Sequence, residues 1–162
     1  MDFIDNLRRS SLGARLDNFA YFYPNIIVGA GFMLTPEFMH ENSITHVINC
    51  AFEEHSPVWF KQIYPEKYVC LNALDGYDVD ILQWYPKFKE YMDKFIKHKE
   101  SNKIFVHCQW GMNRSGFLTL AYVCKEYNLT MKQVMINTLC QRPCLYQNRR
   151  FLKDVSCMLN NG

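Results

Sequence analysis

Short apolar runs and longer helical patterns alternate along this chain. Four short apolar runs, bounded by turn residues, predict strands. They are NIIVG (25–29), THVINC (45–50), KYVCLNA (67–73) and KIFVH (103–107). The last run has the three consecutive apolar residues 104–106 at its centre, so we expect it to be a buried strand near the centre of a sheet.

Helical periodicity follows two of these runs. Residues 80–99 repeat aromatic and aliphatic positions at helical spacing with lysines between them, which predicts a long amphipathic helix. Pro86 lies inside the pattern and predicts an irregular or kinked first turn. A further helix is expected over residues 115–127. Residues 52–60 (FEEHSPVWF) show neither period, so a loop or broken turn is expected there.

Helix starts are marked by capping residues. Thr35 followed by Pro36 is typical of an N-cap and a first helical position. Thr130 with Gln133 three residues later predicts a capping box. Asn148 is expected to cap the last helix.

The alternation of strands and helices predicts an α/β layer fold. We expect a twisted central mixed sheet of about four to five strands with helices on both faces. A length of 162 residues favours one domain covering residues 1–162.

Composition excludes several classes of protein. Apolar residues make up 49% and the formal charge is +2, which gives no support for nucleic-acid binding by bulk charge. No apolar run approaches the ~20 residues needed to cross a bilayer. The first 16 residues mix acids and bases and lack an apolar signal core. We therefore expect a cytoplasmic or nuclear protein, neither secreted nor bound to a membrane.

Seven cysteines are present, without any CxxC pair. Cys140 and Cys144 are four residues apart, but no second ligand pair accompanies them, so no metal site is expected. Six of the seven are interpreted as reduced, buried thiols in a reducing compartment. Cys108 is the exception.

Residues 107–116 read HCQWGMNRSG and join the strand-like run to the helix-like run FLTLAYVC. A strand-to-helix loop directs backbone N–H groups into one concavity, where the helix dipole also favours an anion. Gly111 permits a tight turn, and the planar fork of Arg114 matches two oxygens of a phosphate. The loop is therefore predicted to be an oxyanion cradle.

Cys108 opens this cradle. The N–H groups, the dipole and Arg114 all favour its thiolate, which would be a nucleophile directed at phosphorus. The hydroxyl of Ser115 is placed to donate to that sulfur and to stabilise it as a leaving group. His107 is expected to support the loop through a backbone hydrogen bond; an ordinary satisfied core histidine is the alternative.

The segment His107-Cys108-x-x-Gly111-x-x-Arg114-Ser115-Gly116 resembles the HCxxGxxR[ST]G signature of cysteine-dependent protein tyrosine phosphatases. The short chain and the Arg-Ser ending resemble the dual-specificity branch, including its compact viral members. NIIVGA (25–30), THVINC and QRPCLYQNRRFL (141–152) resemble further segments of that family. The resemblance implies a metal-free and cofactor-free phosphatase. Its phosphate would bind Gln109, Trp110, Gly111, Met112, Asn113 and Arg114.

A phosphatase of this kind needs an acid to protonate the leaving oxygen. The stretch LNALDGYDVDI (71–81) offers three aspartates on a predicted surface loop. Asp80 precedes the helix and is expected to cap it. Asp75 precedes Gly76 and matches the frame of the family's acid, so it is predicted to be the general acid and base; Asp78 is the second candidate.

The variable loop positions constrain the substrate. Gln109, Trp110, Met112 and Asn113 are not basic, whereas relatives that act on inositol lipids tend to carry lysines there. That substrate class is disfavoured, and a phosphorylated protein or peptide is expected. Trp110 either forms an apolar wall against a substrate ring or packs under the loop.

Two rival functions remain. GMNRSGF and RPCLY also resemble the RNA 5′-triphosphatase branch, which would make an RNA 5′ end the substrate, but that branch generally lacks the loop aspartate. A non-catalytic phosphate-binding module is disfavoured because Cys108 and Arg114 are both intact. A basic group could line the pocket rim or form a solvated helix face: Arg142, Arg149, Arg150 and Lys153.

Two regulatory hypotheses follow from the sequence. A reactive Cys108 could be trapped as a disulfide by Cys50, Cys70 or Cys144. Residues 2–7 (DFIDNL) predict a short amphipathic helix. The N-terminal segment 1–23 could dock on its own domain, leaving a monomer, or exchange with a partner in a homodimer.

Overall fold

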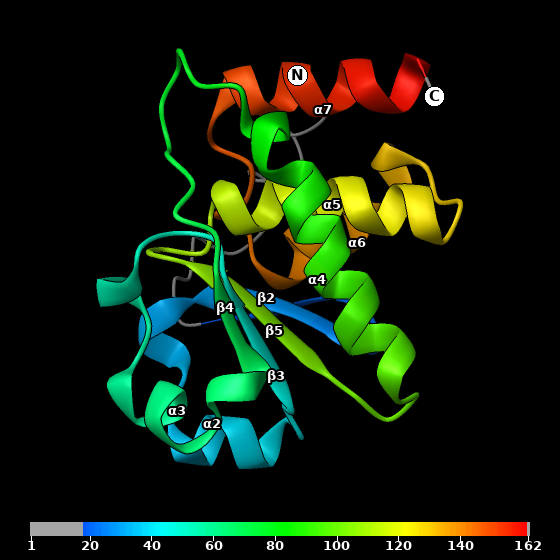
Figure 1. Ribbon diagram of the computed structural model, residues 1–162. Coiled ribbons are helices and arrows are strands. Elements are labelled where there is room, and N and C mark those ends of the chain that lie inside the picture. Colours follow the sequence, from blue (N-terminus) through cyan, green and yellow to red (C-terminus); the bar gives the residue numbers. More distant parts are fainter. Residues whose placement is uncertain (1–17, 162) are drawn as a thin grey trace.

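The computed structural model describes residues 18–161, which form one mixed sheet with helices on both faces (Figure 1). The strand order is β1-β2-β5-β3-β4, and only β1 is antiparallel to its neighbour. The strands are β1 (Ala20–Tyr23), β2 (Ile26–Ala30), β3 (His46–Asn49), β4 (Tyr68–Cys70) and β5 (Ile104–Cys108). The predicted fold class is confirmed, and β5 lies at the centre as expected.

The helices divide between the two faces of the sheet. On one face lie α2 (Pro36–Glu41) and α3 (Val58–Ile63), and on the other α4 (Tyr85–His98), α5 (Arg114–Glu126), α6 (Met131–Gln141) and α7 (Arg149–Asn161) (Figure 1). Short 3-10 turns complete the chain: η1 (Gly31–Met33), η2 (Glu53–His55), η3 (Pro65–Lys67) and η4 (Ile81–Trp84).

The period-two pattern of the strands produces two cores. Phe105 of β5, together with Ile27 and Val47, points to the α2/α3 side. Ile104 and Val106 point to the opposite core under α4–α7. Both faces of these strands are covered, which explains why they read as continuous apolar runs in the sequence.

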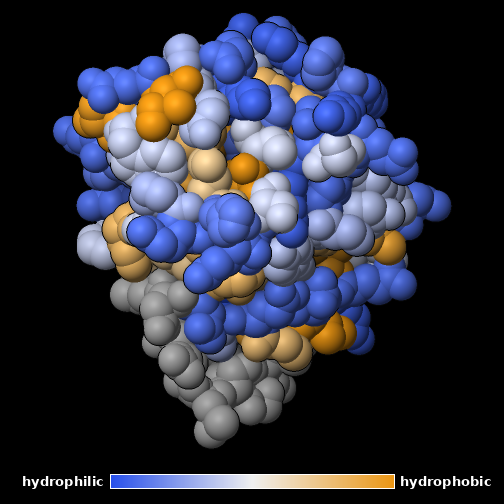
Figure 2. Space-filling model, turned by 90° about the horizontal axis from the view of Figure 1, so that it is seen from below, coloured by the Kyte–Doolittle hydropathy of each residue, from blue (hydrophilic) through white to orange (hydrophobic). Residues whose placement is uncertain are grey.

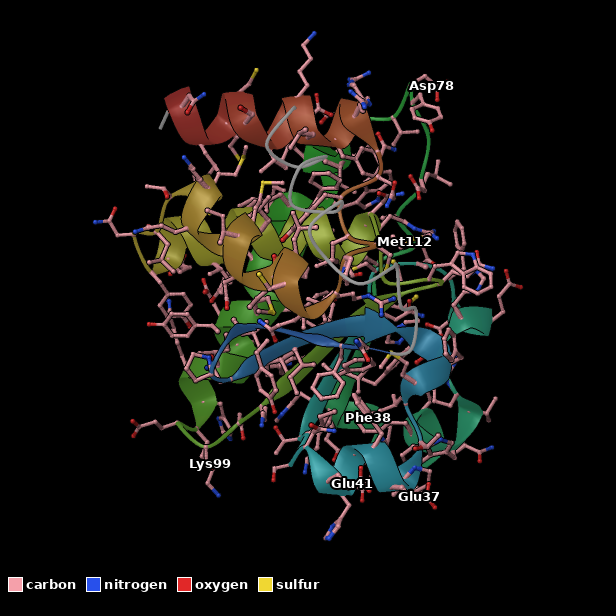
Figure 3. The ribbon with its side chains drawn as sticks, turned by 180° about the vertical axis from the view of Figure 1, so that it is seen from behind. Glu37, Phe38, Glu41, Asp78, Lys99 and Met112 are labelled. Atoms are coloured by element: carbon pink, nitrogen blue, oxygen red, sulfur yellow. The ribbon has the colours of Figure 1, made fainter. Side chains whose placement is uncertain are left out.

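Helix α2 shows how an amphipathic segment covers the sheet. Phe38 lies on its inner side, with its ring centroid 5.2 Å from that of Phe105. Glu37 and Glu41 lie on the outer side (Figure 3). On the face seen from the α2/α3 end, hydrophobic residues form small separate patches among hydrophilic ones (Figure 2).

The predicted helix starts are confirmed. Thr35 accepts a hydrogen bond from the Phe38 amide, and Thr130 and Gln133 form the capping box. Asn148 caps α7 by accepting from the Phe151 amide at 3.1 Å. The helix predicted around Pro86 begins as η4 and becomes α-helical at Tyr85, so the irregular first turn is also confirmed.

Three predictions need correction. Strand β1 was not predicted, and β4 is shorter than the predicted run 67–73. The segment 52–60 contains η2 and the start of α3. Only Phe60 of α3 is buried, so this short helix shows no apolar stripe in the sequence.

The cysteine prediction is partly wrong. All seven thiols are free, but of the six predicted to be buried, Cys140 and Cys157 are exposed and Cys70 is only partly buried. Cys140 and Cys157 lie on the outer faces of α6 and α7. Because apolar residues surround them in the sequence, the sequence pattern did not indicate that these two thiols are exposed.

The N-terminal hypotheses are only partly testable. The predicted helix 2–7 lies outside the described residues. Residues 20–23 form β1, which pairs with β2 of the same chain, so this end of the segment docks on its own domain. Exchange of the preceding residues in a homodimer stays a prediction. Within residues 18–161, no helix is long and apolar enough to cross a membrane.

His107 lies at the carboxyl end of β5, between Gly29 of β2 and Asn49 of β3. It is fully buried, with Nδ1 2.9 Å from the Cys108 carbonyl oxygen and Nε2 3.0 Å from the Ser56 hydroxyl. A neutral ring satisfies both contacts by donating from Nδ1 and accepting at Nε2. Burial lowers the pKa of His107 from 6.5 to about 4.

The stability of the protein should therefore decline in mild acid. Below pH 6.5 His107 becomes protonated in the unfolded chain but stays neutral in the folded chain, which favours unfolding. The contribution of the neutral His107 to the free energy of unfolding is therefore complete at neutral pH and is lost as the pH falls toward 4. We expect this group alone to reduce the free energy of unfolding by about 2 kcal/mol between pH 7 and pH 5. Urea titrations at both pH values measure the difference.

The matched variants are His107→Asn, which removes the titrating ring, and His40→Asn on the exposed side of α2. His107→Asn should lose stability at neutral pH and show a shallower pH dependence, whereas His40→Asn should keep the wild-type dependence. Identical pH dependence in wild type and His107→Asn would contradict the assignment.

Candidate active site

The loop between β5 and α5 is anchored by its carbonyl groups. The Cys108 carbonyl faces His107, the Gln109 carbonyl accepts from the Gly31 amide at 3.4 Å, and the Met112 carbonyl accepts from the Tyr146 amide at 2.9 Å. Between them, the carbonyls of Trp110 and Gly111 both accept from the guanidinium of Arg142. Five consecutive carbonyls therefore point outward, toward the body of the protein.

This anchoring determines where the loop amides point. In a planar trans peptide the N–H lies opposite the C=O, so outward carbonyls direct the following N–H groups to the inside of the loop. The amides of residues 109–113 thus converge on one space at the start of α5. Converging backbone donors at a helix N-terminus form an anion-binding concavity.

Two backbone conformations make this loop possible. Gly111 has φ 66°, and a Cβ there would lie 2.3 Å from the Gly29 carbonyl oxygen, so only glycine fits. Tyr146 also has a positive φ, 65°, which is costly for a bulky residue. Its buried hydroxyl contacts Thr138 at 2.7 Å, and this packing holds the amide that supports Met112.

Cys108 lies at the base of the concavity and is 3% exposed. Its Sγ is 3.2 Å from the Ser115 hydroxyl, and the predicted role of Ser115 as a donor to this sulfur stays a prediction. Burial, and secondly the nearby Cys108, raise the pKa of the Cys50 thiol. Cys50 therefore stays protonated behind the site, and the hypothesis that it traps Cys108 as a disulfide stays a prediction.

Arg114 is the first residue of α5 and is 7% exposed. Its Nη1 donates to the Ala73 carbonyl at 3.0 Å, and its guanidinium carbon lies 6.0 Å from the centre of the Phe52 ring. Its Nε is buried and has no hydrogen-bond partner among the described residues. A buried cationic donor without a partner is costly unless an oxyanion binds there.

Asp75 is tied directly to the loop. One carboxylate oxygen accepts from Asn113 Nδ2 at 3.1 Å, and the other accepts from Asn148 Nδ2 at 2.9 Å. Asn148 also donates to the Gly76 carbonyl at 3.0 Å. The two amides therefore hold the exposed carboxylate of Asp75 above the cradle.

The other two aspartates lie elsewhere. Asp80 accepts from the Leu82 amide at 3.0 Å and caps η4, which confirms its predicted capping role. Asp78 is exposed at the outer turn of the loop, well away from Met112 of the cradle (Figure 3). The geometry brings only Asp75 to the site.

The basic group at the C-terminal side behaves differently from expectation. Arg142 is fully buried behind the loop, so neither predicted position, a pocket rim or a solvated helix face, is correct for it. Arg150 pairs with Asp154 at 3.1 Å along α7, and Lys153 is exposed. No hydrophobic periodicity in the sequence distinguishes Arg142 from the exposed basic residues near it. The one available signal is its position before Pro143, in the segment 141–152 that resembles the phosphatase family.

Asn113 was assigned to substrate binding, yet its side chain has a structural task. Its Oδ1 accepts from the amides of Gln147 and Asn148 at 2.9 and 2.8 Å. Together with its bond to Asp75, this links the loop, the segment that carries Asp75 and the start of α7. No sequence pattern indicates this link, because it depends on three segments that are distant along the chain.

Trp110 is 47% exposed and meets Phe32 edge to face, with ring centroids 6.3 Å apart. It does not pack under the loop, and its alternative role as a wall against a substrate ring stays a prediction. Gln109 and Met112 are partly exposed beside it. Within residues 18–161, no group of three or more His, Cys, Asp or Glu side chains is arranged to hold a metal ion.

Comparisons with known proteins agree with this geometry. Residues 26–159 match the family described as "Dual specificity phosphatase, catalytic domain". The mouse protein phosphatase Slingshot homolog 3 is 28% identical over 157 residues, which is 95% of this chain but 23% of that protein. The chain thus spans less than a quarter of such a relative.

Solved structures show the same fold. The human tyrosine phosphatase-like serine/threonine/tyrosine-interacting protein has a TM-score of 0.75 at 18% identity, covering 90% of this chain and 97% of that one. Human DUSP28 has a TM-score of 0.75 at 15% identity, covering 94% and 98%. With the cradle, its cysteine and its arginine in place, and with the family match over residues 26–159, the chain belongs to the dual specificity phosphatase catalytic-domain family, a family of hydrolases.

Proposed function

We propose that this domain hydrolyses phosphotyrosine and phosphoserine or phosphothreonine in proteins through a phosphocysteine on Cys108. The observation that carries the proposal is the link from Asp75 through Asn113 to the phosphate loop. An acid fixed to the same loop that holds the phosphate is placed to protonate an ester oxygen.

The first step transfers the phosphoryl group to sulfur. The Cys108 thiolate attacks phosphorus, the S–P bond forms and the P–O bond of the ester breaks. Asp75, as the carboxylic acid, gives its proton to the departing oxygen. The inward amides and Arg114 bind the equatorial oxygens, so most of the rate comes from positioning and charge stabilisation.

The second step releases phosphate. Asp75, now a carboxylate, accepts a proton from a water that attacks phosphorus, and the P–S bond breaks. Ser115 donates to the sulfur as it leaves, at the distance of 3.2 Å seen here. Each oxygen of Asp75 keeps an acceptor position besides the one used by Asn113 or Asn148, which leaves room for the proton.

The same proposal extends to the setting of the domain. We infer that residues 1–162 form one catalytic domain, whose partners are phosphorylated proteins or peptides. Seven free thiols support a reducing compartment, the cytoplasm or nucleus. The Slingshot relative is much longer, so any further activity of a whole protein is a separate matter.

An RNA 5′-triphosphatase is the second candidate, favoured by the loop sequence GMNRSGF. Its phosphoanhydride leaving group needs little protonation. A carboxylate held by two amides above the cradle has no evident use in that reaction, which supports the protein phosphatase.

Substitution of the two reacting groups distinguishes these functions. We expect Cys108→Ser to abolish phosphate release from a phosphotyrosine peptide, and Asp75→Asn to slow it by about 100-fold, the lower range for loss of a general acid. Phosphate release is measured on this peptide and on a 5′-triphosphate RNA in parallel, with Asp78→Asn as the matched control. Turnover of the RNA alone, unaffected by Asp75→Asn, would make the protein phosphatase proposal wrong.

The amide link makes a separate prediction about leaving groups. Asn113→Ala should misplace Asp75, and therefore slow esters of poor leaving groups, such as a phosphotyrosine peptide, by about tenfold. Dinitrophenyl phosphate, whose leaving group hardly needs a proton, should react almost normally. The ratio of the two kcat values is the measurement.

Gln147→Ala is the control for this link, because its side chain donates to the Cys144 carbonyl and does not touch Asp75. It should leave the ratio unchanged. Equal losses on both esters in Asn113→Ala would show that Asn113 shapes the phosphate loop and does not position the acid.

A further inference from the structure

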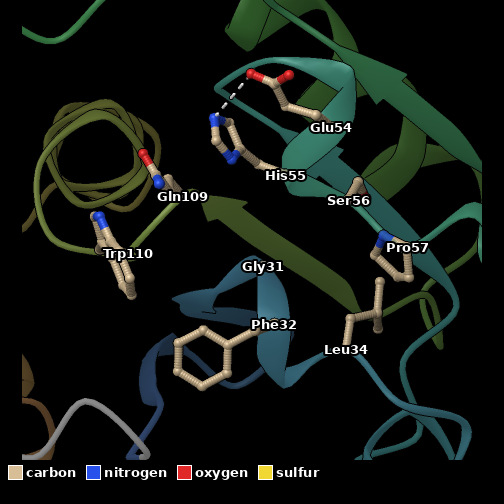
Figure 4. Close-up of a pocket in the computed structure, with 9 residues that line it drawn as sticks. All are labelled: Gly31, Phe32, Leu34, Glu54, His55, Ser56, Pro57, Gln109 and Trp110. Atoms are coloured by element: carbon tan, nitrogen blue, oxygen red, sulfur yellow. Dashed lines mark ion pairs between the residues drawn. The ribbon is translucent and has the colours of Figure 1, made fainter.

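A pocket of about 340 Å³ opens directly beside the phosphate loop (Figure 4). Three segments build it: the turn after β2 with Phe32 and Leu34, the segment 54–57, and Gln109 with Trp110 of the loop itself. Its volume lies in the usual range for a small ligand site. The two reaction steps proposed above act on the phosphate and do not require this pocket, although Gln109 and Trp110 of its lining were predicted to bind substrate.

The walls of this Phe32–Trp110 pocket are aromatic. Phe32 is 58% exposed and Trp110 47% exposed, although both are large apolar side chains. Their rings stand edge to face at 66°, above the buried Leu34. Exposed aromatic surface gathered around a hollow is typical of a binding site.

The pocket is rigidly joined to the catalytic loop. Gln109 and Trp110 directly follow Cys108, and their carbonyls are bound by Gly31 and Arg142. A Cβ on Gly31 would lie 2.0 Å from the His55 carbonyl oxygen. The turn after β2 therefore packs against the segment 54–57 at a distance that only a glycine at position 31 permits. The pocket is therefore preformed, which lowers the entropic cost of binding.

The rim disfavours an anionic occupant. Glu54 and His55 lie 3.7 Å apart and face each other at the rim (Figure 4). The Glu54 carboxylate opposes an anion such as a second phosphate, and its side chain is 77% exposed. The apolar walls, in contrast, are open to an occupant, because the Phe32 and Trp110 rings meet each other and both stay exposed.

We propose that the Phe32–Trp110 pocket receives an aromatic side chain of the substrate, one or two positions from the phosphorylated residue. This inference rests on the proposed protein phosphatase function. Neighbouring Cα atoms in a peptide are about 3.8 Å apart, so a residue that flanks the cradle reaches a pocket walled by the residues next to Cys108. The pocket thus determines which substrate sequences are preferred, while the cradle binds the phosphate.

The test uses phosphotyrosine peptides in an alanine background, each with one phenylalanine at position −2, −1, +1 or +2. We expect phenylalanine at one of these positions to raise kcat/KM about tenfold over the all-alanine peptide. The aromatic contact and the apolar area that it buries stabilise the complex by about the free energy that corresponds to this factor. Phe32→Ala should remove this preference. Its hydrolysis of p-nitrophenyl phosphate and of the all-alanine peptide should stay as in wild type.

The matched control is Val58→Ala, an exposed apolar residue that follows Pro57 but does not line the pocket. It should keep the phenylalanine preference. Equal turnover of all peptides by wild type would make the pocket proposal wrong and leave the phosphatase proposal standing. A preference for lysine or arginine that Glu54→Gln abolishes would replace the aromatic occupant by a cationic one. No turnover of any peptide, with cleavage of 5′-triphosphate RNA, would overturn both.

Discussion

The site depends on the direction of the peptide units in the loop after β5. Every peptide unit carries one donor and one acceptor on opposite sides, so a loop can present all its donors to a ligand only if its acceptors are satisfied elsewhere. Here Arg142 binds two of these acceptors, and Gly31 and Tyr146 bind two more. A fully buried guanidinium is costly to desolvate, but behind this loop its charge also favours an anion in front of it.

The sequence predicted the parts of the site that are local. The strand before Cys108, the helix after Arg114 and the glycine between them follow from a few consecutive residues, because strand period, helix start and positive φ are local properties. Thr130 and Asn148 were predictable as caps for the same reason. Helix α3 was missed because a short helix with a single buried residue carries no periodic signal.

The parts that sequence reasoning missed all join segments distant along the chain. Arg142 reaches back 31 residues to Gly111, and Asn148 reaches back 73 residues to Asp75. Such contacts depend on how the sheet brings the carboxyl ends of β4 and β5 to one edge. A basic residue near the C-terminus gives no sign of whether it will face solvent or a backbone carbonyl.

The Asn113 hydrogen bond joins the phosphate loop to the loop that carries Asp75. The acid loop is exposed and contains a glycine, so alone it would sample many conformations. Bonds from Asn113 and Asn148 restrict it where Asp75 overlies the cradle, and Asn113 is itself fixed by the amides at the start of α7. Geometry at the phosphate is thus set by the sheet, by Arg142 and by α7 together. The Phe32–Trp110 pocket is built on the same anchored loop, so a side chain bound there is held in a fixed relation to the phosphate.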